Sequence, residues 1–260
     1  MSSFDVPGAR LDVELSDEGG HPVVQLHGLT SSRARDRMLA LDLGRGLNGT
    51  RLLRYDARGH GRSTGQPVQD HYRWENLAGD LLALLDHWFP GEQVHGVGPS
   101  MGTATLLHAA VRDPQRFSGL TLLIPPTAWE TRVAKGADYR AAADLIEAGG
   151  LSDFIEASRL VAPPPATIGL PETVPDAPES LLPSLFRGAA LSDLPAADQI
   201  AGIDVPVTIL AWTEDPSHPV STAEMLHELL PHSMLDIART RADLQSWPGT
   251  LAADVARHGS

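Results

Sequence analysis

Five consecutive residues, Gly98-Pro99-Ser100-Met101-Gly102, have the types and the spacing that a nucleophilic serine needs. A short apolar run that we expect to be a strand precedes them, and a helix-like run, residues 103–112, follows. Glycines two residues before and two after the serine allow a sharp turn, because no Cβ has to fit there. In such a turn the serine hydroxyl is exposed and the next backbone N–H points toward the group under attack. The stretch therefore predicts a nucleophile at Ser100.

A second polar stretch, His27-Gly28-Leu29, follows a predicted apolar strand at residues 22–26. A strand that ends in this way lets the following amides face the same cleft as the serine. We expect the backbone N–H groups of Leu29 and Met101 to form an oxyanion hole, in which side-chain identity matters little. His27 itself is interpreted as a hydrogen-bonded structural histidine rather than as a catalytic base.

An acid is predicted in the loop after the strand at residues 207–211. Asp215 lies there between Glu214 and Pro216. The carboxyl end of a parallel strand is where such sheets bind ligands, so Asp215 is the candidate acid. A solvated turn aspartate is the alternative interpretation, and Glu214 competes for the role if the register differs by one residue.

Predicted strands and helices alternate along most of the chain. Strands are expected at residues 10–15, 22–26, 51–55, 94–97, 120–124, 207–211 and 234–238, and helices at residues 32–47, 74–89, 103–112, 222–230 and 242–257. Short, regular alternation of this kind is typical of an α/β fold, with a mostly parallel sheet covered by helices on both faces.

The alternation stops between residues 126 and 202, where residues 139–147 and 152–159 have helical patterns and prolines interrupt the rest. We therefore expect a helical cap (lid), residues 126–202, inserted into a core formed by residues 1–125 and 203–260. Trp129 and Tyr139 are candidates for the wall of an apolar substrate pocket, together with Phe154 and Phe186. Aromatic residues of this kind more often form only the core of the cap.

The composition restricts the class of partner. With 260 residues, 42% of them hydrophobic, the chain is long enough for one large domain or for a core with an insertion. A formal net charge of −13 argues against nucleic acid and anionic membranes as main partners. The chain has no cysteine, no basic-then-apolar secretory pattern at its start and no apolar run that would span a bilayer. We expect a cytoplasmic protein that acts on a small molecule, and no motif predicts its oligomeric state.

No cofactor is expected either. The glycines around Ser100 do not fit a dinucleotide-binding fingerprint, and no histidines or carboxylates have the spacing of metal ligands. The loop from Asp56 to Ser63, Asp-Ala-Arg-Gly-His-Gly-Arg-Ser, fits neither a P-loop nor a dinucleotide turn. We interpret it as a structural loop at the edge of the cleft.

Together, His27-Gly28, the loop from Asp56 to Ser63, the turn at Ser100, and Asp215 with Pro219 four residues later resemble the α/β-hydrolase superfamily. The resemblance covers about residues 8–125 and 203–257. It implies the α/β-hydrolase fold, with the insertion in the place of the cap. Among the branches of the superfamily, the chain looks most like small lactonases and esterases such as 3-oxoadipate enol-lactonase. That implies an esterase or lactonase acting on a small ester, thioester or lactone.

The chain departs from that resemblance at the catalytic base. In the superfamily the nucleophile, the acid and a histidine follow one another along the chain, and the histidine comes after the last core strand. Here residues 239–247 follow that strand and contain no histidine. His232 precedes the strand and His258 lies almost at the end of the chain. A lone serine is a poor nucleophile, so another base is needed for hydrolysis.

His218, three residues after Asp215, is the leading candidate, because an aspartate in its loop could orient the imidazole. Its difficulty is reach, since the resemblance implies that its loop begins two strands away from the strand of Ser100. His27 and His60 belong to other loops at the cleft, and His95 is more typical of a core histidine. Without a histidine base, the chain would be a hydrolase-fold protein that binds a small molecule or catalyses non-hydrolytic chemistry. A dehalogenase would need a carboxylate in place of Ser100.

Overall fold

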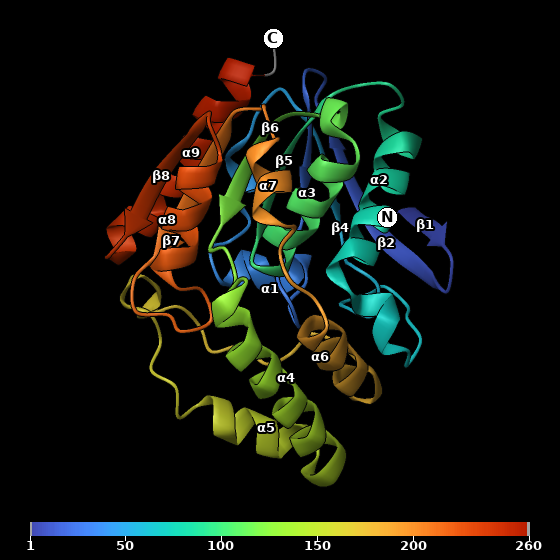
Figure 1. The fold of residues 1–260 in the computed structure, drawn as a ribbon. Helices are drawn as coiled ribbons and strands as arrows, with labels where there is room; N and C mark the ends of the chain where they lie inside the picture. Colours follow the sequence, from blue (N-terminus) through green and yellow to red (C-terminus); the bar gives the residue numbers. More distant parts are fainter. Residues whose placement is uncertain (1, 259–260) are drawn as a thin grey trace.

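A computed structural model describes residues 2–258, and its strands form one eight-stranded sheet (Figure 1). The strands are β1 (Ser2–Val6), β2 (Ala9–Asp17), β3 (Pro22–Gln25), β4 (Arg51–Tyr55), β5 (Val94–Pro99), β6 (Phe117–Leu123), β7 (Val207–Trp212) and β8 (Ser233–Ala238). Their order across the sheet is β1-β2-β4-β3-β5-β6-β7-β8. Strand β2 pairs antiparallel with both β1 and β4, and the other neighbours pair parallel, so the predicted mostly parallel sheet is confirmed.

Helices cover both faces of this sheet. They are α1 (Arg33–Met38), α2 (Trp74–Trp88), α3 (Met101–Arg112), α4 (Glu130–Gly149), α5 (Leu151–Ser158), α6 (Leu182–Ala190), α7 (Ala197–Ala201), α8 (Val220–Leu229) and α9 (Arg241–His258). Side chains of α2, α3, α7 and α8 belong to one apolar cluster and those of α9 to a second. Because successive strand residues point to opposite faces, Leu53 joins the first cluster and its neighbour Leu52 the second. No helix of the described chain is long and apolar enough to cross a bilayer.

Between β6 and β7 the chain forms α4, α5 and α6, which lie together below the sheet in Figure 1. Helices α4 and α6 pack against each other, and a third apolar cluster, which includes Ile146, Leu182 and Leu185, fills the space between these elements. Ile200 of α7 instead joins the first core cluster. The division into a core and a cap at residues 126 and 202 stays a prediction. Helix α7, at the C-terminal end of the predicted cap, packs with the core.

The predicted elements and the observed ones differ in several places. The helix expected at residues 32–47 is only α1 followed by a 3-10 turn, Leu43–Gly46. The chain turns at Ala40, whose φ is +58°, and the Gln25 side chain then bonds Leu41 O and Gly44 N in place of helical partners. Strand β1 was not predicted, because it is short and mostly exposed. Helix α4 begins nine residues before the predicted start at 139.

Candidate active site

Ser100 occupies a strained turn between β5 and α3. Its φ of +53° and ψ of −109° are unfavourable for a residue with a Cβ. A Cβ on Gly98 or on Gly102 would lie 2.9 or 3.0 Å from the Cβ of Leu26, so both positions need glycine. The Ser100 amide donates to Leu123 O at 2.9 Å, which ties the turn to the end of β6. The surrounding structure thus holds the serine in a conformation that presents its hydroxyl.

The structure brings Ser100, His218 and Asp215 together. His218 Nε2 lies 2.8 Å from Ser100 Oγ, and its Nδ1 lies 2.8 Å from Asp215 Oδ2. The Ser100 residue is 8% exposed, and the side chains of His218 and Asp215 are 18% and 14% exposed. An imidazole between a hydroxyl and a carboxylate can accept the hydroxyl proton while its other N–H stays bound.

A compact loop overcomes the distance between β7 and the serine strand. Strand β7 is two places from β5, with β6 between them. The loop crosses the end of β6, because Thr127 N donates to Ser217 O at 3.2 Å in the segment that leaves that strand. A turn closed by His218 N and Asp215 O, 3.1 Å apart, then directs the imidazole toward Ser100.

Asp215 is held by three donors. The Trp212 indole N–H donates to Oδ2 at 2.8 Å, His218 Nδ1 donates to the same oxygen, and Ser217 N donates to Oδ1 at 2.9 Å. Burial by itself raises the pKa of Asp215, but these hydrogen bonds and the electrostatic interaction with His218 outweigh it and hold the pKa well below its usual value. The carboxylate is therefore ionised and fixed in orientation.

Helix α9 fills the region after the last strand. Trp247, which is fully buried, stacks on Trp212 with ring centroids 6.2 Å apart and planes 14° apart. Its partner Trp212 is the residue that donates to Asp215. His232 lies before β8, is exposed, and contacts Asp204 at 3.1 Å. Trp247 thus packs against the tryptophan that binds Asp215. It belongs to the segment after the last strand, in which the resemblance would place a histidine.

The two predicted oxyanion donors come from the first residue of α3 and from the loop after β3. Met101 is the first residue of α3, so its N–H has no acceptor within the helix. The loop with Leu29 passes beside the serine, since a Cβ on Gly28 would lie 3.7 Å from the Ser100 Cβ. Ser31 N donates to Gly28 O at 3.1 Å, and this turn fixes the segment.

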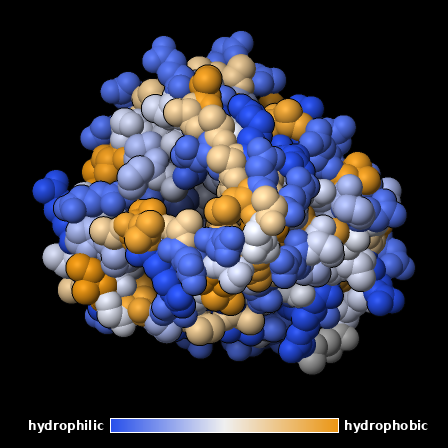
Figure 2. All heavy atoms as spheres, turned by 90° about the horizontal axis from the view of Figure 1, so that it is seen from below, coloured by the Kyte–Doolittle hydropathy of each residue, from blue (hydrophilic) through white to orange (hydrophobic). Residues whose placement is uncertain are grey.

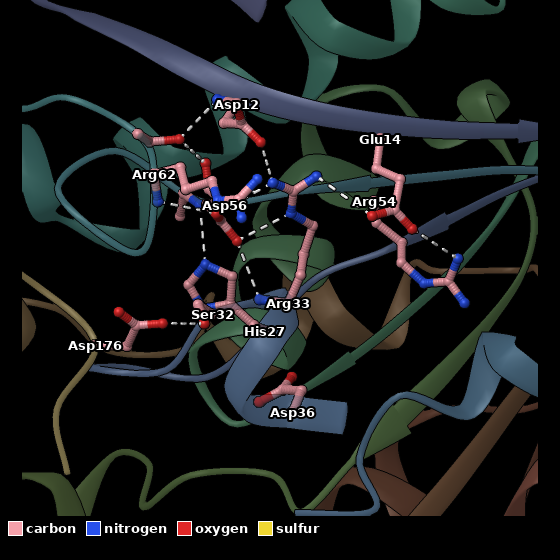
Figure 3. A network of polar contacts seen from close by, with 12 residues as sticks. Asp12, Glu14, His27, Ser32, Arg33, Asp36, Arg54, Asp56, Arg62 and Asp176 are labelled. Carbon is pink, nitrogen blue, oxygen red and sulfur yellow. Dashed lines mark hydrogen bonds and ion pairs between the residues drawn. The ribbon is translucent and has the colours of Figure 1, made fainter. Parts of the chain in front are cut away.

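A buried polar network anchors that segment to the loop after β4 (Figure 3). The backbone N and the Nε of Arg33 each lie 3.0 Å from Asp56 Oδ1, and Arg62 N donates to Oδ2. The guanidinium also pairs with Asp12. Burial raises the pKa of Asp56, but hydrogen bonds from Arg33 and the Arg62 amide outweigh it, and the net pKa is lowered. Asp56 therefore serves the loop structure, and the position of the Asp56–Ser63 loop at the edge of the cleft stays a prediction.

The other histidines near the cleft have structural partners. His27 accepts from Ala57 N at 2.9 Å through Nε2 and donates to Gly28 O at 2.8 Å through Nδ1, so both ring nitrogens are used. His60 is fully buried, donates to Arg58 O, and has its pKa lowered to about 3 by burial. His95 is buried in β5 and contacts Thr121 Oγ1 at 2.8 Å. None of these three rings contacts Ser100.

Ser100 and His218 open into a cavity of about 190 Å³. Apolar residues form most of its wall, and the full lining is Gly28, Leu29, Thr30, Ser31, Arg35, Asp36, Leu39, Leu41, Pro99, Ser100, Ile124, Trp212 and His218. Trp129 and Tyr139 do not line it. The Trp129 indole donates to Pro195 O, and Tyr139 of α4 packs on Phe186 of α6, as Phe154 of α5 does. Across residues 2–258, no group of three or more histidines and carboxylates is arranged to hold a metal ion.

Two features of the site were not predicted from the sequence. One is the hydrogen bond from Trp212 to Asp215. The sequence contained a signal for it, because a buried indole N–H needs an acceptor and Asp215 is three residues away. The other is the contribution of residues 31–41 to the cavity, which were expected to be a plain helix. The bend at Ala40 turns Leu39 and Leu41 toward Ser100.

Comparison with known proteins gives consistent results. A family model described as alpha/beta hydrolase fold matches residues 21–245. The 3-oxoadipate enol-lactonase 2 of Acinetobacter baylyi is 31% identical over 197 residues, which is 72% of this chain and 69% of that protein. Among solved structures, a thermophilic esterase from Thermogutta terrifontis superposes with a TM-score of 0.78 at 19% identity, covering both chains fully. An enol-lactonase from Burkholderia xenovorans gives a TM-score of 0.70 at 20% identity over 99% of each chain.

Proposed function

The chain belongs to the α/β-hydrolase fold family, and on that premise we propose that it is a serine hydrolase acting on a small ester, thioester or lactone. The observation that carries the proposal is the 2.8 Å contact between His218 Nε2 and Ser100 Oγ, with Asp215 on the opposite ring nitrogen. The named relatives are esterases and lactonases, which favours the same class of bond.

In the proposed reaction Ser100 Oγ attacks the carbonyl carbon while His218 Nε2 takes the hydroxyl proton. The N–H groups of Leu29 and Met101 stabilise the negative charge on the carbonyl oxygen. Asp215 keeps the Nδ1–H tautomer and stabilises the imidazolium. His218 then gives the proton to the leaving oxygen or sulfur. Water, deprotonated by His218, releases the acyl group and restores Ser100.

A fluorophosphonate probe tests the nucleophile directly. We expect one covalent adduct on the wild-type protein, located at Ser100 by peptide mass spectrometry, and no adduct on Ser100→Ala. Ser246→Ala is the control, because Ser246 is an exposed serine of α9 whose hydroxyl donates to the nearby Asp243 O, and its labelling should persist. Labelling of Ser100→Ala at an unchanged rate, or no labelling of the wild type, would count against a serine nucleophile. Binding of a small molecule without turnover, unchanged by Ser100→Ala, would support the non-hydrolytic alternative.

A smaller effect is expected from Trp212→Phe, which keeps an aromatic ring beside Trp247 but removes the N–H that binds Asp215. One hydrogen bond to a charged group contributes about 1.5–3 kcal/mol, and only part of it is lost from the transition state. We expect kcat to fall by about threefold to thirtyfold. KM should change little, and the pH–rate profile should shift because the carboxylate becomes more basic. An unchanged profile with an unchanged kcat would show that the indole only packs.

A further inference from the structure

We propose that the groove between Leu39 and the cap segment 158–173 binds an unbranched alkyl chain of the substrate, extending the cavity at Ser100. This inference rests on the proposed function and names its substrate class, an ester or thioester with a linear chain of about six to ten carbons. The groove is lined by Leu39, Ser158, Arg159, Val161, Pro163, Thr167, Leu170, Pro171, Glu172 and Thr173 and has a volume of about 420 Å³.

The cavity at Ser100 is too small to be the whole binding site. Its volume is about 190 Å³, whereas small-molecule sites usually measure about 300–1,000 Å³. The reacting group and a few carbons would fill it. A larger substrate must therefore leave the cavity on one side, and the cavity and the groove share one residue, Leu39.

An apolar wall joins the two spaces. Ile124, Leu41 and Trp212 of the cavity belong to one buried apolar cluster. Leu39 and Leu170, which line the groove, pack against that same cluster from outside. Apolar side chains therefore connect the cavity at Ser100 to the groove, and such side chains suit methylene groups. The polar residues of the groove are Ser158, Arg159, Thr167, Glu172 and Thr173.

The charged groups of the groove are already paired. Arg159 Nε lies 2.6 Å from Glu172 Oε1, and Arg35 Nε of the cavity donates to Thr173 Oγ1 at 2.6 Å. The Arg35 bond therefore joins the wall of the cavity to the wall of the groove. Val161, in the groove wall, is 66% exposed, so most of its apolar surface is open to solvent. Figure 2 views the molecule from the side of α4 and α5, where hydrophobic side chains interrupt a largely hydrophilic surface.

Two series of esters test the groove. The first varies the acyl chain of p-nitrophenyl esters from acetate to decanoate, and the second varies the alcohol of alkyl acetates over the same lengths. A buried methylene contributes about 0.8 kcal/mol, or about fourfold, so a partly open groove should raise kcat/KM about twofold to fourfold per methylene in one series. The series that responds identifies whether the acyl or the alcohol chain lies in the groove.

Leu39→Trp narrows the passage and should lower the decanoate-to-acetate ratio of kcat/KM, or its alcohol-series equivalent, by about tenfold or more. Because Leu39 also lines the cavity at Ser100, the acetate turnover of the variant serves as its own baseline, and only the ratio is compared with the wild type. Val133→Trp, on an exposed position of α4 outside both spaces, is the matched control and should leave the ratio unchanged. A wild-type profile that is flat with chain length, with acetate turnover intact, would overturn the groove and leave the hydrolase proposal standing.

Binding gives a readout that does not depend on turnover. Calorimetric titration of Ser100→Ala with sodium butyrate, octanoate and decanoate should show tighter binding for each longer carboxylate. Adding Leu39→Trp should remove that trend. If Ser100→Ala binds all three carboxylates equally well, the groove proposal is refuted, even if no ester is hydrolysed. If binding tightens with chain length but the wild type hydrolyses no ester, only the hydrolase proposal is refuted.

Discussion

Replacing His218 by alanine is expected to lower kcat for a p-nitrophenyl ester by roughly 10⁴-fold or more, because Ser100 then loses the base that takes its proton. The ring is the one imidazole of the described chain placed 2.8 Å from Ser100 Oγ. KM should change by no more than about threefold, since the imidazole acts in the transition state rather than in ground-state binding. Steady-state kinetics with the purified variant, together with the fluorophosphonate labelling rate, measure both effects.

His232→Ala is the control for this experiment. His232 is exposed, lies before β8, and pairs with Asp204 on the surface, so its loss should leave kcat unchanged. Near-wild-type activity in His218→Ala would mean that another group activates Ser100. His27 and His60 are poorly suited to replace it, because His27 has partners at both ring nitrogens and His60 is completely buried.

The turn at Ser100 and the sheet around it follow from local signals. Gly98 and Gly102 are required by the close approach of Leu26, and the apolar strand pattern follows from burial on both faces. Both signals lie within a few residues of the feature that they predict. For the same reason Asp215 could be proposed at the end of β7 from its position alone.

The route of the loop to Ser100 could not be predicted in the same way. Whether His218 spans two strand positions depends on the contact between Thr127 and Ser217, which joins segments 90 residues apart in the sequence. The bend at Ala40 is similar, because Gln25 of β3, 16 and 19 residues before its partners Leu41 and Gly44, supplies the hydrogen bonds that replace a helix. Tertiary contacts override local helical pattern there. Hence several histidines remained candidates for the catalytic base when only the sequence was considered. For the same reason, the contribution of Leu39 and Leu41 to the cavity wall was not predicted.

Asp215→Asn is expected to lower kcat by on the order of 10³-fold to 10⁴-fold while leaving the fold intact. The carboxylate accepts from three donors, Trp212, Ser217 and His218, but an asparagine has only one acceptor oxygen. If the asparagine oxygen takes the place of Oδ2, the amide NH₂ group faces the Ser217 N–H. If the oxygen takes the place of Oδ1 instead, the NH₂ group faces the N–H groups of Trp212 and His218. Either arrangement leaves donors facing each other and removes the negative charge that stabilises the imidazolium.

The neighbouring carboxylate provides the matched control for that substitution. Glu214 is exposed and its φ is +61°, so its side chain leaves the loop in another direction from Asp215. Glu214→Gln should therefore keep kcat within about twofold, since a surface carboxylate contributes little. Circular dichroism and thermal unfolding of both variants would separate a catalytic loss from misfolding. A large loss in Glu214→Gln with activity retained in Asp215→Asn would assign the acid to the other residue, whereas equal small effects would argue that His218 needs no carboxylate partner.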